Sequence, residues 1–101
     1  MHTNSQDGAD ITIIKGRGRR IREEKYDPDK LHSSIAGACI SSGAPSGYAE
    51  SIARKVVGEV DKWLESRPEV TSSDLRRIAA QKLKSYHPDA SYLYEHNRST
   101  L

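Results

Sequence analysis

Positive charge gathers in one short stretch near the start of the chain, and its residue types suit a phosphate-bearing anion. Five of the eight residues from Lys15 to Arg22 are cationic, two are glycine and none is acidic. Arginine forks match phosphate oxygens bidentately, and glycine lets the backbone approach an anion closely. The stretch also leads toward the start of an expected helix, where the helix dipole favours negative charge. A phosphate site is therefore one interpretation of this stretch.

Two other interpretations remain open on the residues alone. Charge runs commonly face water, so the segment could be a solvated hairpin. The string GRGRR also has the donors of an RNA- or DNA-binding arm, although no aromatic residues are interleaved with it for base stacking. Residues 15–30 carry a net charge of +3 and the rest of the chain −1, within a total of +2. Such local charge favours one discrete anion-facing site over general coating of nucleic acid.

Two carboxylates lie close to the expected helix start and limit what the site could hold there. Asp27 and Asp29 flank Pro28 at this point. They would repel a phosphate placed directly beside them. Ribose hydroxyls, or a Mg²⁺ ion carried by the phosphates, fit these two side chains better.

Other reactive residue types form no catalytic or metal-binding pattern. The four histidines are scattered without metal-ligand spacing, and the chain has no nucleophile motif. Glu23 and Glu24 are adjacent, so in a strand they point to opposite faces and do not form a carboxylate pair. The single cysteine, Cys39, excludes an internal disulfide and falls on an apolar helix face, which predicts a buried and unreactive thiol. We therefore expect no enzyme and no protein-bound metal.

Length and composition indicate one domain with a modest core. The chain has 101 residues, of which 35% are hydrophobic and 30% charged, with no Phe and one Trp. No apolar run approaches the ~20 residues of a membrane helix, so no membrane contact and a cytoplasmic location are expected. The first ten residues are polar and are expected to be a disordered leader, and residues 99–101 a tail.

The predicted fold class is α+β, with a short N-terminal β-hairpin packed on a four-helix, bundle-like domain. Ile11–Ile14 form a β-rich run, Gly16 and Gly18 permit a turn, and Arg19–Tyr26 can return as a second strand. A hairpin alone is marginal in water, so this one needs helices to pack on.

Capping residues and apolar spacing predict four helices after the hairpin. The first begins at Pro28 with Asp27 as N-cap, and a second runs from about Tyr48 to Arg67. The third has Thr71 as N-cap, with Asp74 three residues later as in a capping box, and the last runs from Asp89 to about Arg98. The expected inward-facing residues are Leu31, Ile35, Ala38, Cys39, Ile52, Val56, Val60, Trp63, Leu64, Leu75, Ile78, Ala79, Leu83, Tyr86, Ala90, Leu93 and Tyr94.

The order and spacing of four segments resemble the ATP-cone domain. They read ITIIKGRG, EKYDPDKL, EVTSSDLRRIAAQKL and DASYLYEHNR, and together they span about residues 11–98. The family has K-R-D-G where this chain has KGRG, and its hairpin is about three residues shorter. The family's final Y-x-x-Y-R reads YEHNR here, with Asn97 in place of the second tyrosine.

The resemblance implies a regulatory domain that binds ATP or dATP, with Mg²⁺ held through the phosphates. ATP cones occur in ribonucleotide reductase large subunits and in the repressor of ribonucleotide reductase genes. Nucleotide occupancy would then control conformation, self-association or a regulated protein partner. The alternatives are a nucleic-acid-binding module that uses the basic hairpin, and an interaction domain with a degenerate nucleotide site. The nucleotide-binding residues that the resemblance implies are Lys15, Arg17, Glu24, Asp27, Lys30, Ser72 and Arg76.

Overall fold

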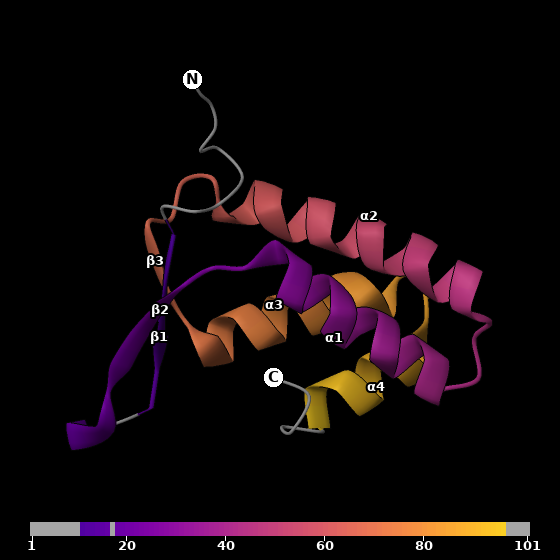
Figure 1. Cartoon of the computed structure of the whole chain (residues 1–101), viewed down its shortest axis with the longest axis horizontal. Helices are drawn as coiled ribbons and strands as arrows, with labels where there is room; N and C mark the ends of the chain where they lie inside the picture. Colours follow the sequence, from indigo (N-terminus) through magenta and orange to yellow (C-terminus); the bar gives the residue numbers. More distant parts are fainter. Residues whose placement is uncertain (1–10, 17, 97–101) are drawn as a thin grey trace.

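A small β-sheet lies at one end of a group of four helices (Figure 1). The structure is a computed structural model that describes residues 11–16 and 18–96. The predicted α+β class is confirmed. In chain order the elements are β1 (Thr12–Lys15), η2 (a 3₁₀ turn, Gly18–Arg20), β2 (Arg22–Lys25), α1 (Pro28–Ser41), α2 (Ser46–Leu64), β3 (Glu69–Thr71), α3 (Ser72–Lys84) and α4 (Pro88–His96).

The sheet has three strands in the order β2-β1-β3, so the prediction of a hairpin alone was incomplete. β1 pairs antiparallel with β2 and parallel with β3. The sequence pattern predicted Thr71 only as a helix cap, yet Val70 and Thr71 also pair with Ile13 and Ile14. A three-residue strand is too short to show alternation, which explains why the pattern did not reveal it.

The predicted starts of α1 and α3 are confirmed by their capping bonds. Asp27 Oδ1 accepts hydrogen bonds from the backbone N–H of Asp29 and Lys30, at 3.0 and 3.3 Å. Thr71 Oγ1 accepts one from the N–H of Asp74 at 3.0 Å. Each cap satisfies N–H groups that have no partner inside the helix. The two caps therefore fix where both helices begin, beside the sheet.

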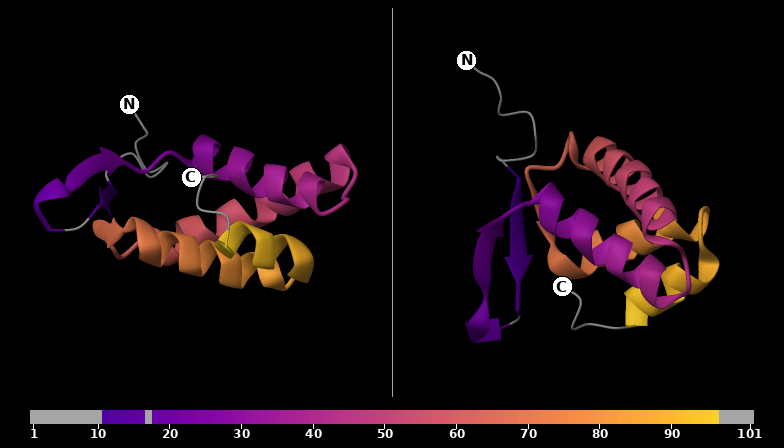
Figure 2. Two further views of the ribbon diagram at one scale, coloured as in Figure 1. Left: turned by 90° about the horizontal axis from the view of Figure 1, so that it is seen from below. Right: turned by 45° about the vertical axis from the view of Figure 1, so that its right-hand side comes forward.

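The helices bury most of the residues that their spacing predicts to face inward, although Tyr86 and Leu93 are only partly buried. α1 packs on α2 and α4, while α3 packs on α4, α2 and the sheet, as the two views in Figure 2 show. Ile13 and Val70 extend this core from the inner face of the sheet. Trp63 is only half-buried, and the Arg67 guanidinium lies 4.2 Å from its ring centroid. No helix among residues 11–16 and 18–96 is long and apolar enough to cross a membrane.

Two tyrosine hydroxyls join α2 to the segments around it. The Tyr26 hydroxyl donates to Asp61 Oδ1 at 2.7 Å, and the Tyr86 hydroxyl donates to Glu59. Burial, and then the bond to Asp61, raise the pKa of Tyr26 above its usual range. Tyr26 therefore stays a neutral donor that ties the end of the hairpin to α2.

Candidate functional site

A cavity of about 260 Å³ opens between the hairpin, the start of α1 and the start of α3. Six of the seven residues that the resemblance implies as a binding site line this one cavity. The seventh, Arg17, lies outside the described residues. The six are Lys15, Glu24, Asp27, Lys30, Ser72 and Arg76.

Strand pairing explains why the hairpin residues face the cavity together. Lys15 pairs with Arg22 and Ile13 with Glu24, and directly opposed side chains lie on the same face of a sheet. Because side chains alternate along a strand, Ile13 and Lys15 also share that face. Ile13 is buried, so this is the face that packs toward the helices. The hairpin thus presents Lys15, Arg22 and Glu24 to the cavity.

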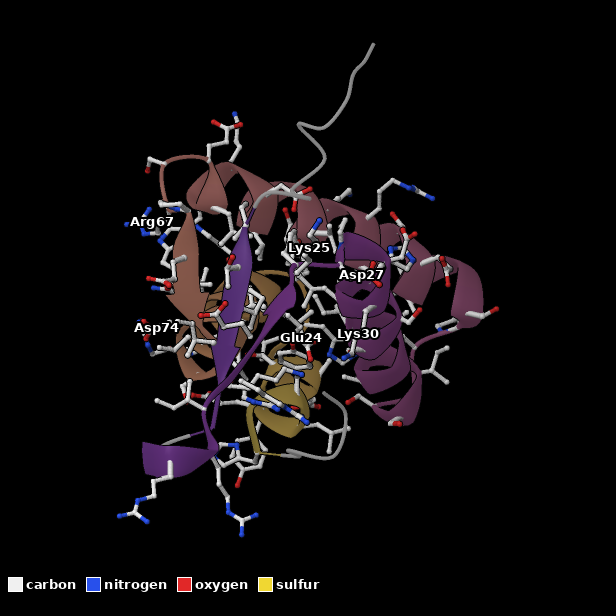
Figure 3. The ribbon with its side chains drawn as sticks, turned by 60° about the vertical axis from the view of Figure 1, so that its left-hand side comes forward. Glu24, Lys25, Asp27, Lys30, Arg67 and Asp74 are labelled. Atoms are coloured by element: carbon white, nitrogen blue, oxygen red, sulfur yellow. The ribbon has the colours of Figure 1, made fainter. Side chains whose placement is uncertain are left out.

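Glu24 lies between two lysines from different elements. Its Oε1 is 3.1 Å from Lys15 Nζ on β1 and 3.5 Å from Lys30 Nζ on α1. Figure 3 shows Glu24 and Lys30 close to each other at the junction of β2 and α1. The hydrogen bond from Lys15 is the main cause that lowers the pKa of Glu24 below its ordinary value, with the charge of Lys30 adding to it. A carboxylate therefore holds both lysines at the cavity.

Asp27, which also lines the cavity, is the N-cap of α1. Its Oδ1 is engaged in capping α1, as described above. A carboxylate has two oxygens, so a ligand hydroxyl or a metal-bound water could still be met by the other one. The cap also aims the first turn of α1, which carries Lys30, at the cavity.

The first turns of α3 supply the opposite wall. Ser72 and Arg76 are four residues apart, which places them on one helix face. Arg76 Nη1 donates to the backbone carbonyl of Tyr94 at 3.1 Å, and its guanidinium lies 5.6 Å from the Tyr94 ring centroid. Tyr94 is fully buried on α4, where burial raises the pKa of its hydroxyl to about 12. Arg76 therefore joins the cavity wall to α4.

The floor of the cavity is apolar. Ile13, Leu31 and Leu75 are buried residues that line it, together with Tyr26. Ligand sites commonly combine such a floor with a few placed polar groups. A flat aromatic ring could lie on this surface while an anionic tail reaches the lysines. The arrangement suits a ligand with one apolar, planar end and one strongly negative end.

Sequence reasoning missed two cations in the lining, Arg22 and Lys25. Arg22 could have been found by placing Lys15 and Arg22 opposite each other across the predicted turn. Among the described lining residues, five side chains are cationic and two are carboxylates: Lys15, Arg22, Lys25, Lys30 and Arg76 against Glu24 and Asp27. The excess of positive charge favours an anionic ligand. Within the described ranges, no group of three or more His, Cys, Asp or Glu side chains could hold a metal ion.

Comparison with known proteins gives this cavity a family context. Residues 11–98 match the ATP cone domain. This chain belongs to the ATP-cone family. The family consists of regulatory nucleotide-binding domains, and the match covers both walls of the cavity.

One curated relative of this ATP-cone chain is a regulator of transcription. The chain is 38% identical over 74 residues to the transcriptional repressor NrdR of Thermosynechococcus vestitus. The aligned region covers 73% of this chain and 43% of the repressor, so the chain spans less than half of that relative's length. No solved structure matches the chain.

Proposed function

We propose that this ATP-cone domain binds a purine nucleoside triphosphate, ATP or dATP, in the cavity between hairpin and helices. The observation that carries the proposal is the convergence of Lys15, Glu24, Asp27, Lys30, Ser72 and Arg76 on one cavity. These residues come from four elements or their caps and are up to 61 positions apart in the chain.

Each group of lining residues has a role in this proposal. Lys15 and Lys30 neutralise the triphosphate, with Arg17 from the hairpin as a further expected contact. Glu24 and Asp27 read the base or the sugar, while Ser72 and Arg76 face the nucleotide from α3. The apolar floor seats the purine ring. Mg²⁺, where it takes part, is carried by the phosphates.

Nucleotide binding requires the lysines to change partners. Glu24 forms ion pairs with both Lys15 and Lys30 in the present arrangement, and a triphosphate would compete for both lysines. The cavity of about 260 Å³ is also slightly smaller than the ~300–1,000 Å³ typical of ligand pockets. A complete nucleotide would therefore extend out of the cavity or move the hairpin outward.

The proposed role is regulatory, and we assign the domain no chemical step. A ligand that contacts both hairpin and helices favours one relative placement of the two, so occupancy shifts a conformational equilibrium. The readout would be self-association or the activity of a protein partner. The similarity to a transcriptional repressor fits a regulatory protein of this kind.

A thermal-shift series tests this function. A ligand at a concentration of a hundred times its Kd adds about 2.7 kcal/mol to the free energy of unfolding. This raises the melting temperature of a domain of this size by ~10 °C. We expect such a rise with ATP and dATP in the presence of Mg²⁺, a smaller rise with GTP, and none with Mg²⁺ alone.

Two variants, each with one lysine charge removed, test whether the nucleotide binds in this cavity. Lys30→Gln should lose most of the nucleotide-induced rise, because Lys30 lines the cavity. Lys84→Gln removes an exposed positive charge outside the cavity and should keep the full rise. No shift of the wild-type protein at millimolar nucleotide would refute the proposal.

A further inference from the structure

The connection between β1 and β2 projects as an arginine-bearing tip. We define the hairpin tip as Gly18–Ile21, which comprises η2 and the residue after it. Arg19 and Arg20 are exposed, and Ile21 is 56% exposed between Arg20 and the start of β2. The tip extends away from the helices at the far end of the hairpin (Figures 1 and 2).

The two tip arginines are not part of the nucleotide cavity. Neither Arg19 nor Arg20 is among the residues that line it, whereas Arg22, at the base of the tip, is. No salt bridge to an acidic side chain is formed by either arginine among residues 11–16 and 18–96. Within the described residues, the two arginines therefore take part neither in these ion pairs nor in the lining of the proposed nucleotide site.

The connection between β1 and β2 has a backbone conformation that requires glycine at one position. Gly16 has φ +86°, and a Cβ built there would lie 2.0 Å from the Arg20 carbonyl oxygen. The chain thus folds closely back on itself at Gly16, and only glycine fits. A two-residue turn would suffice to join a paired Lys15 and Arg22, yet six residues are used here. Arg19 and Arg20 lie in this added length, between the two paired strands.

We propose that this hairpin tip binds the phosphate backbone of duplex DNA. Arginine forks match phosphate oxygens, and a two-stranded β-ribbon is narrow enough to enter the major groove. Ile21 supplies one apolar contact of the kind that thymine methyl groups accept. The described tip has no aromatic side chain on which unpaired bases could stack, so single strands fit it less well.

A folded protein partner fits the tip less well than a polyanion. Protein interfaces bury ~800 Å² on each side around a centre depleted in charge. The tip offers one exposed apolar side chain, Ile21, flanked by charge. The same two strands continue into the cavity through Lys15 and Arg22, so nucleotide occupancy would influence how the tip is presented.

Fluorescence anisotropy with a labelled duplex of ~30 mixed-sequence base pairs tests the proposal. The full chain should bind at about 50 mM salt, and the logarithm of its binding constant should fall linearly with the logarithm of the salt concentration up to about 200 mM. The variant Arg19→Gln/Arg20→Gln should bind at least ~10-fold more weakly. Its salt slope should be smaller by about 2, since each lost phosphate contact contributes ~0.9.

The matched control removes the same charge elsewhere. Arg54 and Lys84 are exposed on α2 and α3, and Arg54→Gln/Lys84→Gln should change the affinity less than ~3-fold. Both variants should keep the wild-type melting temperature and its response to ATP, which separates this test from that of the nucleotide site. Absence of duplex binding at about 50 mM salt would overturn the proposal. So would equal losses in the two variants, or tighter binding of a single strand of the same length.

Discussion

Glu24 is the residue on which the electrostatics of the cavity depend. It joins Lys15 of β1 to Lys30 of α1, so one carboxylate orders cations from two elements. The Glu24 side chain is 40% exposed. Its ion pairs therefore stabilise the fold only modestly, because exposed ion pairs contribute ~0.2–1 kcal/mol each. Its chief effect is to place two cations where a phosphate could replace the carboxylate.

The lowered pKa of Glu24 gives a pH prediction. Folding favours the carboxylate, so the stability from Glu24 is present above the ordinary pKa of 4.5 and is lost as pH falls through the lower folded-state pKa. In a ¹³C NMR titration of the side chain, Glu24 should titrate below 4.5. Lys15→Gln should move this pKa upward, because the Lys15 hydrogen bond is the main cause of the shift.

An exposed lysine provides the control for that titration. Lys84→Gln removes a charge outside the cavity and should leave the Glu24 pKa unchanged. If Glu24 titrated at 4.5 or above in the wild-type protein, the ion pairs described here would not exist in solution.

Residue types alone predicted part of the site. The basic stretch indicated an anion-binding site, and the carboxylates near the helix start indicated contacts to ribose or Mg²⁺, whereas Lys30 was assigned only through the family resemblance. The choice of Ser72 and Arg76 depended on the family resemblance, since nothing in their spacing relates them to the hairpin. Arg22 was missed because strand register decides which cations of a charged run face inward. Lys25 lies at the end of β2 and lines the cavity although it follows Glu24 directly, so alternation along the strand does not predict it.

At the scale of elements, capping and apolar spacing predicted the helices well and the sheet less well. Asp27 and Thr71 start helices as expected, and the predicted last helix is present as α4, which begins at Pro88, one residue before its predicted start. The second strand is shorter than predicted, because Gly18–Arg20 form a 3₁₀ turn. β3 was missed because its stability comes from pairing with β1, a contact between residues far apart in the chain. The predicted leader (1–10), the end of the last helix (97 and 98) and the tail (99–101) lie outside the described residues.

The hairpin connection gives a prediction at this scale. Gly16→Ala should destabilise the fold by more than ~1–2 kcal/mol, because it combines a left-handed backbone with a clash against the Arg20 carbonyl. Gly18→Ala is the matched control, with φ +61° and nothing within 4 Å of an added Cβ, so it carries the backbone strain alone. Urea unfolding of both variants measures the difference.

Gly16→Ala should also affect the proposed nucleotide site. Gly16→Ala should weaken nucleotide binding as well, since displacement of the turn moves Lys15 and Arg22. Equal free energies of unfolding for the two variants would show that the close approach at Gly16 is absent in solution.

At the scale of the whole molecule, the cavity contacts every helix through the residues that line it. Tyr26 bonds to Asp61 on α2, and Arg76 bonds to the carbonyl of Tyr94 on α4. Lys30 and Ser72 belong to the first turns of α1 and α3. A ligand that rearranges these side chains would therefore act on the arrangement of the whole helical group, as a regulatory domain requires.

Mapping amide shifts in a ¹H–¹⁵N NMR titration with ATP and Mg²⁺ tests the central claim most directly. The proposal predicts shifts at β1, β2 and the first turns of α1 and α3. It predicts larger shifts there than in the separate groove on α3 and α4, at Gln81 and Lys84. Shifts confined to that groove, or no shifts at millimolar ATP, would contradict the assignment of the cavity as the nucleotide site.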